Sequence, residues 1–157
     1  MSQAATKIDN GAFVQEAIEN FLVLLDDMDF TDVYTLMGIG RLQFMRRRQM
    51  LIECRGLYIG LWRLALNRSF PNDADAMLAE FLERFAQNHP DKLGARVIER
   101  AGEYWGMLQA RGDTDFRGVA AHLCSFLMQE KQADQSLILR LVLHIRRTYE
   151  HIFARLL

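Results

Sequence analysis

The sequence predicts an all-α fold, a single-domain bundle of about six helices built around a long second helix. Apolar residues recur along most of the chain at spacings of three and four, which is the helical period. Half of the residues are hydrophobic and only two are prolines, and no segment alternates apolar and polar residues as a strand does. A chain of 157 residues is long enough to bury a substantial core in one domain, residues 1–157.

The first helix is predicted from about Asn10 to Met28, after a flexible tail over residues 1–9. One face of this helix is apolar and the opposite face carries four acids, as in an amphipathic surface helix. The apolar residues are Phe13, Ala17, Phe21, Leu24 and Leu25, and the acids are Glu16, Glu19, Asp26 and Asp27.

The second helix is predicted to start after Thr31 or Asp32 and to extend as far as Arg68. At a rise of 1.5 Å per residue it would be roughly 55 Å long. Gly38 and Gly40 are the points where it would bend or break, because glycine is a poor helix former.

The second half of this helix is apolar around its whole circumference. Between Gly56 and Leu66 the only charged residue is Arg63. A helix that is apolar on every side is buried on every side. We therefore expect it to be the central helix of the bundle.

Turn and cap residues mark the remaining helices. Pro71 ends the second helix, and short connections predict that neighbouring helices are antiparallel. The predicted starts are Asn72 or Asp73 for the third helix, Pro90 for the fourth, Asp113 or Thr114 for the fifth and Asp134 for the sixth. The fourth helix is predicted to end at Arg111, with Gly112 as its C-terminal cap.

Charge is distributed in blocks of alternating sign. Residues 1–32 carry one lysine against seven acids, a net charge of −6, and residues 33–68 carry seven arginines against Glu53, a net charge of +6. Residues 69–116 and 117–157 carry −4 and +3, so the whole chain is close to neutral at −1. Such blocks in one small domain favour pairing within the chain or between subunits over a polyanionic ligand.

An arginine stripe on the second helix is a candidate partner-binding site. Arg46, Arg47 and Arg48 diverge on a helix, because each residue turns by about 100°. The stripe is formed by residues spaced by seven: Arg41, Arg48 and Arg55. We expect a protein contact there, with nucleic acid as the alternative. Nucleic-acid-binding domains often have a pI above about 9, whereas this chain has a pI of about 6.4.

Two glycine pairs spaced by four predict that the second and fourth helices cross closely. They are Gly56 with Gly60 and Gly102 with Gly106. Glycine costs about 1 kcal/mol relative to alanine inside a helix, so close backbone approach would explain its presence. The alternative is a ligand or catalytic pocket near Trp62 and Trp105.

No arrangement of residues predicts catalysis or metal binding. His144 and His151 share a helical face, but seven residues separate them by about 10.5 Å, too far for one metal ion. The sequence contains no phosphate-binding loop, nucleophile elbow or Glu-x-x-His pair. We therefore expect no cofactor, no metal and no catalytic residue, and an enzyme is the less favoured interpretation.

The cysteines and the length of the apolar runs indicate the cellular compartment of the protein. Cys54 and Cys124 lie within apolar helical patterns, which suits reduced thiols in the cytoplasm. The N-terminal residues show no secretory pattern, and no uninterrupted apolar run reaches about 18 residues. We expect a cytoplasmic protein without a membrane span.

The last helix is predicted to support self-association. Six residues follow a four-three spacing, the pattern of a coiled-coil-like contact: Ile138, Val142, Ile145, Tyr149, Ile152 and Leu156. Leu137 and Leu141 lie outside this seam, and we expect the core to leave them uncovered and available to a second copy.

These observations favour a non-enzymatic interaction, adaptor or regulatory protein that acts through protein–protein contacts, as a homodimer or a larger assembly. A nucleic-acid-associated regulator using the arginine stripe is the first alternative. A small-molecule-binding or catalytic helical bundle is the second.

Overall fold

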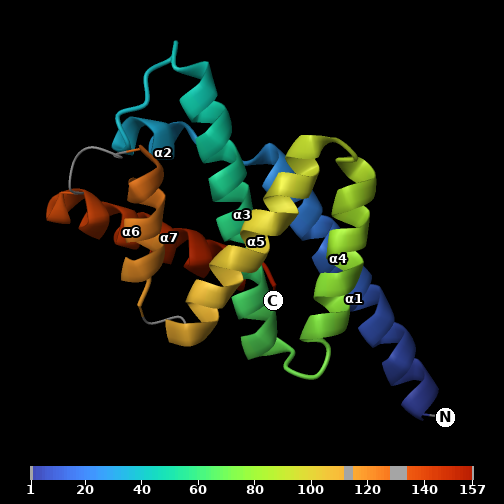
Figure 1. The fold of residues 1–157 in the computed structure, drawn as a ribbon. Coiled ribbons are helices and arrows are strands. Elements are labelled where there is room, and N and C mark those ends of the chain that lie inside the picture. The colour runs from blue at the N-terminus through green and yellow to red at the C-terminus, as the bar shows by residue number, and fades with distance from the viewer. Residues whose placement is uncertain (1, 112–114, 128–133, 157) are drawn as a thin grey trace.

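The computed structural model describes residues 2–111, 115–127 and 134–156, and every helix within them is an α-helix (Figure 1). The described residues form seven helices and no strand, which confirms the all-α fold class. Their bounds are α1 Ser2–Asp27, α2 Thr31–Leu36, α3 Phe44–Ser69, α4 Ala74–Asn88, α5 Lys92–Arg111, α6 Arg117–Leu127 and α7 Gln135–Ala154. None of the described helices has the length and apolar character needed to span a membrane.

Helix α3 forms the centre of the bundle, as the apolar circumference predicts. In Figure 1, α5 crosses it, α1 and α4 lie to one side, and α6 and α7 lie to the other. From Gly56 to Trp62 every residue of α3 is buried. The Trp62 ring stacks on Phe21 of α1 at 4.6 Å and contacts Phe81 of α4 at 4.9 Å, so one side chain joins three helices.

The long second helix predicted from Thr31 to Arg68 is in fact two helices. Gly38 has a φ of +69°, which ends α2 in a left-handed turn that only glycine adopts readily. Met37 and Ile39 on either side of it are buried in the core, which fixes the path of the turn. Helix α3 therefore starts afresh at Phe44.

The first residues of the helices show which of the predicted N-cap positions are correct. Asp73 and Asp134 are the N-cap residues of α4 and α7, and the Asp134 carboxylate accepts a hydrogen bond from the backbone N–H of Ser136. The caps expected at Gly112, Asp113 and Thr114 lie outside the described residues. Where a tail was predicted over residues 1–9, α1 already begins at Ser2.

The predicted helix crossing is present and depends on the glycines of α3 alone. A Cβ atom on Gly56 would lie 2.7 Å from Cβ of Arg100, and one on Gly60 would lie 3.1 Å from Cδ1 of Leu108, both on α5. Gly102 and Gly106 have open space where a Cβ would be, so they take no part in the crossing.

Candidate functional site

The start of α3 projects from the bundle and exposes three large apolar side chains. Leu42, Phe44 and Met45 are 85%, 71% and 84% exposed, and the other large apolar residues that are exposed are between 38% and 55%. We call residues 40–48, which carry them, the tip. Solvent-facing apolar residues are ordinary singly, but a cluster of three is the kind of surface that binds a partner.

Hydrogen bonds hold the tip in one conformation. The backbone N–H of Gly40 donates to Oε1 of Gln43 at 2.9 Å, and Nε of Arg47 donates to the Gly40 carbonyl at 3.0 Å. The Arg47 guanidinium also lies 5.0 Å from the centre of the Tyr34 ring of α2. The apolar side chains are therefore presented by an ordered turn.

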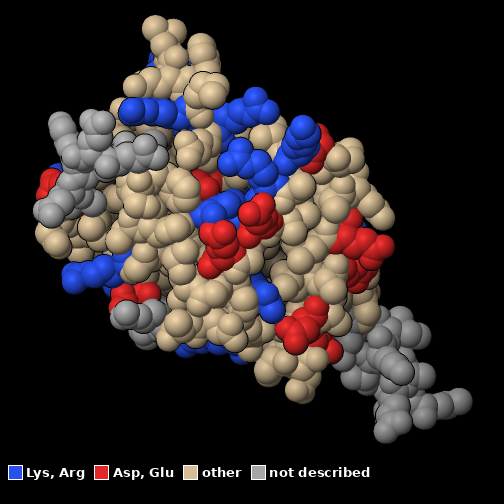
Figure 2. Space-filling view, viewed as in Figure 1, with Lys and Arg blue, Asp and Glu red and all other residues tan. Residues whose placement is uncertain are grey.

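Arginines surround the apolar residues of the tip. Arg41, Arg46 and Arg48 are exposed, and Figure 2 shows Lys and Arg side chains gathered below the projecting top of the molecule. Arg41 and Arg48 were predicted as site residues, but Arg41 lies in the turn before α3, so the two are not on one helical line. The tip is thus both apolar and basic.

Arg55, the third residue of the predicted stripe, belongs to a different environment. It is half-buried, and its Nε atom is buried without a hydrogen-bond partner. The structure therefore brings Arg41 and Arg48 to the tip and leaves Arg55 below it, beside the core.

The two leucines predicted to face a second copy are not equivalent. Leu141 is buried in the core, so the expectation that it lies uncovered is wrong, and Leu137 is half-buried and packs against the core. The leucines that α7 exposes are Leu139 and Leu143, at 54% and 44%. The face of α7 that packs against α3 and α6 is wider than the predicted seam of residues at four-three spacing. Leu141 lies on this wider face.

Sequence reasoning also missed the exposure of Leu42, Phe44 and Met45. Phe44 and Met45 stand seven residues before Leu51 and Ile52, which lie in or against the core, so spacing alone groups them with core residues. The signal that identifies them is the pair of glycines just before them, Gly38 and Gly40. Because the helix is interrupted there, no other described helix packs over the first turn of α3.

A network of polar side chains lies where α3, α5 and α6 meet. Glu53 of α3 is only 2% exposed, and its carboxylate accepts hydrogen bonds from Nε of Arg100 and from the Tyr104 hydroxyl. Arg100 also donates to Nε2 of His122 at 2.8 Å and pairs with Glu103. Because Arg100 and Tyr104 already occupy the Glu53 carboxylate, the network stabilises the helix junction and offers no free catalytic base.

Burial changes the acid–base behaviour of this network. It raises the pKa of Tyr104, an effect that the neighbouring Glu53 carboxylate strengthens. Burial also lowers the pKa of His122, and the positive charge of Arg100 lowers it further. Tyr104 is therefore a hydrogen-bond donor and His122 a neutral acceptor at neutral pH.

No metal site forms among the described residues, where no group of three or more His, Cys, Asp or Glu side chains could hold an ion. Cys54 and Cys124 are buried free thiols, and burial raises the pKa of both. A buried thiol with a raised pKa is a poor nucleophile.

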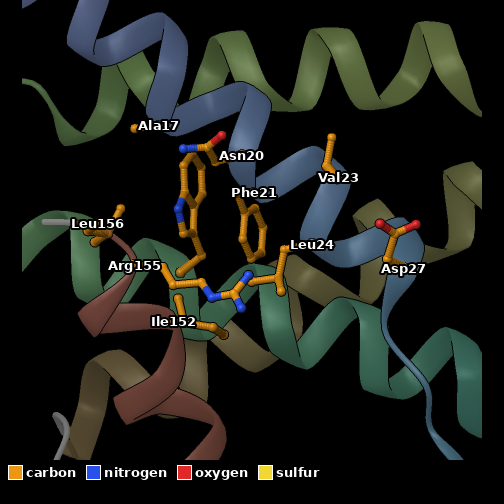
Figure 3. Close-up of a pocket in the computed structure, with 10 residues that line it drawn as sticks. Ala17, Asn20, Phe21, Val23, Leu24, Asp27, Ile152, Arg155 and Leu156 are labelled. Carbon is orange, nitrogen blue, oxygen red and sulfur yellow. The ribbon is translucent and has the colours of Figure 1, made fainter.

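The two tryptophans do not line a common pocket. Trp105 lies under the guanidinium of Arg63, at 4.3 Å, whereas Trp62 stacks on Phe21. A groove of about 410 Å³ does reach Trp62, between α1 and the end of α7 (Figure 3). The groove therefore reaches Trp62 and not Trp105.

Comparison of the chain with protein-family models, with curated proteins and with solved structures found no match.

Proposed function

We propose that this chain is a non-enzymatic interaction protein whose tip binds an acidic segment of a partner protein that also carries apolar residues. The observation that carries the proposal is the high exposure of Leu42, Phe44 and Met45, three apolar residues within four positions of the chain. Moving one such side chain out of water contributes about 1.5–3 kcal/mol, so three together supply a substantial binding energy.

The charge around these residues determines the kind of partner. Arg41, Arg46 and Arg48 surround the apolar centre, and arginine is enriched in protein interfaces, where its guanidinium pairs with carboxylates in a fixed geometry. A partner with acidic residues flanking an apolar core matches both features. A cytoplasmic location is part of this proposal, in keeping with the two reduced thiols.

The apolar content of the tip supports protein over nucleic acid as the partner. Surfaces that bind single strands combine basic residues with several aromatic platforms, and the tip has one aromatic ring, Phe44. Leu42 and Met45 have no role in contacts to phosphates.

The test compares three forms of the full chain as affinity baits in extracts of the source cell. They are the wild type, a tip variant with Leu42→Ser, Phe44→Ser and Met45→Ser, and a matched control with Leu139→Ser and Leu143→Ser, which removes exposed leucines elsewhere. All five positions are exposed, so each variant should fold, because surface substitutions change stability by only about 0.5 kcal/mol.

We expect one acidic partner protein to be retained by the wild type and the control and lost by the tip variant. Arg41→Glu with Arg48→Glu should release it as well. Equal retention by all three baits would overturn the proposal. So would an Arg41- and Arg48-dependent complex with nucleic acid that weakens steeply with salt, or binding of the tip to vesicles of anionic lipid without any protein partner.

Self-association is the second arrangement that the surface supports, through the exposed Leu139 and Leu143 of α7. Light scattering at micromolar concentration should then show an oligomer that the control variant converts to a folded monomer. A wild-type monomer would remove this arrangement and leave the tip proposal intact.

A further inference from the structure

The groove beside Trp62 has the dimensions and the walls of a small-molecule site. It encloses about 410 Å³, within the roughly 300–1,000 Å³ that ligand pockets occupy. Its apolar lining comes from three helices, with Phe21 and Leu24 of α1, Trp62 of α3, and Ile152 and Leu156 at the end of α7.

The polar groups of the groove are few and lie at its rim. They are Asn20 and Asp27 of α1 and Arg155, the C-cap residue of α7. Figure 3 shows the Arg155 guanidinium reaching across the groove toward α1, close to Phe21 and Leu24, while Asp27 lies farther along α1. Arg155 is exposed, and among the described residues no carboxylate lies within ion-pair distance of it.

We propose that this groove binds a small molecule with a carboxylate on an apolar body. The guanidinium of Arg155 would take the carboxylate in a two-pronged hydrogen bond, because its planar donors match the two carboxylate oxygens. The apolar body lies over Phe21, Leu24 and Leu156, and Asn20 is a second polar group at the rim, away from Arg155 (Figure 3). This site is separate from the tip, and its function does not depend on the partner proposed there.

Removing the charge of Asp27 should change ligand affinity in the opposite direction to removing the charge of Arg155. The Asp27 carboxylate lines the same groove and repels a bound anion, so it limits the affinity that Arg155 provides. Removing the two charges one at a time should therefore change carboxylate affinity in opposite directions, a result that a general apolar surface would not give.

The experiment uses three probes with the same tail: octanoate, 1-octanol and octylammonium. The chain has two tryptophans, so Trp105→Phe leaves Trp62 as the only one and keeps an aromatic ring beneath Arg63. Fluorescence of Trp62 then reports on the groove directly. Variants Arg155→Gln and Asp27→Asn are compared with Arg140→Gln, which removes an exposed arginine of α7 that does not line the groove.

We expect saturable binding of octanoate, with an affinity up to about fivefold higher than that of 1-octanol or octylammonium, since a rim ion pair contributes up to about that factor. Arg155→Gln should abolish this preference, Asp27→Asn should increase it and Arg140→Gln should leave it unchanged. The proposal is overturned if no probe changes Trp62 fluorescence, if 1-octanol or octylammonium binds as tightly as octanoate, or if Arg155→Gln has no effect. Circular dichroism of each variant verifies that the fold is retained.

Discussion

Arg100 of α5 and Glu53 of α3 form an ion pair at the junction of the two helices, with Nε of Arg100 2.9 Å from one carboxylate oxygen and 3.0 Å from the other. The two residues are 47 positions apart in the sequence. The pair lies directly beside the Gly56 contact, where a Cβ atom would lie 3.0 Å from the Ala101 nitrogen of α5.

Removing one partner of this pair should be costly. Arg100→Ala leaves the Glu53 carboxylate buried without its counter-charge, which typically costs about 3–5 kcal/mol. Glu53→Gln should cost less, because the amide oxygen still accepts from Tyr104. Urea unfolding measures both, with Arg96→Ala, an exposed position on the same helix, as the control. Equal stability of Arg100→Ala and Arg96→Ala would show that the pair does not stabilise the fold.

The close contact of α3 with α5 at Gly56 predicts that a glycine-to-alanine substitution changes stability in opposite directions at two positions. Gly56→Ala places a Cβ 2.7 Å from Cβ of Arg100 and 3.0 Å from the Ala101 nitrogen, and such overpacking costs about 1–3 kcal/mol. Gly102→Ala meets no atom within 4 Å and should stabilise the protein by up to about 1 kcal/mol through helix propensity. Thermal unfolding of the two variants distinguishes the signs. A destabilised Gly102→Ala would contradict the open space beside it.

Two histidines should make the fold sensitive to mild acid. Burial lowers the pKa of His122 and of His144 below the usual value of 6.5, and the charge of Arg100 lowers that of His122 further. The unfolded chain then takes up protons at a higher pH than the folded chain does. The stability that the neutral imidazoles contribute is therefore complete above pH 6.5 and is lost as the pH falls through their folded pKa values.

The measurement is the free energy of unfolding in urea between about pH 7.5 and pH 5.5, a range in which ordinary carboxylates scarcely titrate. The wild type should lose stability toward the acid end. A variant with His122→Gln and His144→Gln should lose distinctly less, because glutamine keeps a hydrogen-bonding side chain and has no proton to take up. An equal loss in both proteins would assign the pH dependence to other groups.

The same substitution at two leucines of α7 should distinguish the buried face of the helix from its exposed face. Leu141 is 1% exposed, so Leu141→Glu buries an unpaired carboxylate and should unfold the chain or nearly so. Leu139→Glu places the same group on the exposed side of the helix and should be tolerated. Circular dichroism with temperature compares the two. A folded Leu141→Glu variant would show that α7 does not pack on the core through this face.

The sequence predicted those features that depend on local chemistry. Asp134 was recognised as a helix cap because a cap needs only its own side chain and the next few residues. Asp73, one of two candidates for α4, stands at the N-cap position, but its side chain makes no cap hydrogen bond. The central position of α3 followed from its apolar circumference, which leaves no face suited to water. Close approach at Gly56 followed from the absence of a side chain there.

Other features depend on which helices become neighbours, and periodicity does not contain that information. Leu139 and Leu141 are about 200° apart around α7 and both have apolar neighbours on their own side of the helix, so only the positions of α3 and α6 decide which side is covered. The same limit applies to the tip, where Phe44 and Met45 have the spacing of core residues but no helix packs over them. The ion pair between Glu53 and Arg100 likewise joins residues with no shared local pattern.

The crossing of α3 and α5 has a further consequence for how the molecule opens. Amide hydrogens exchange with solvent only when the structure around them opens, and different regions open with different free energies. Where backbones approach as closely as at Gly56 and Gly60, water reaches the contact only when the two helices come apart. We therefore expect the amides from Cys54 to Leu61 to exchange last, through global unfolding, while those of the tip exchange early through local opening.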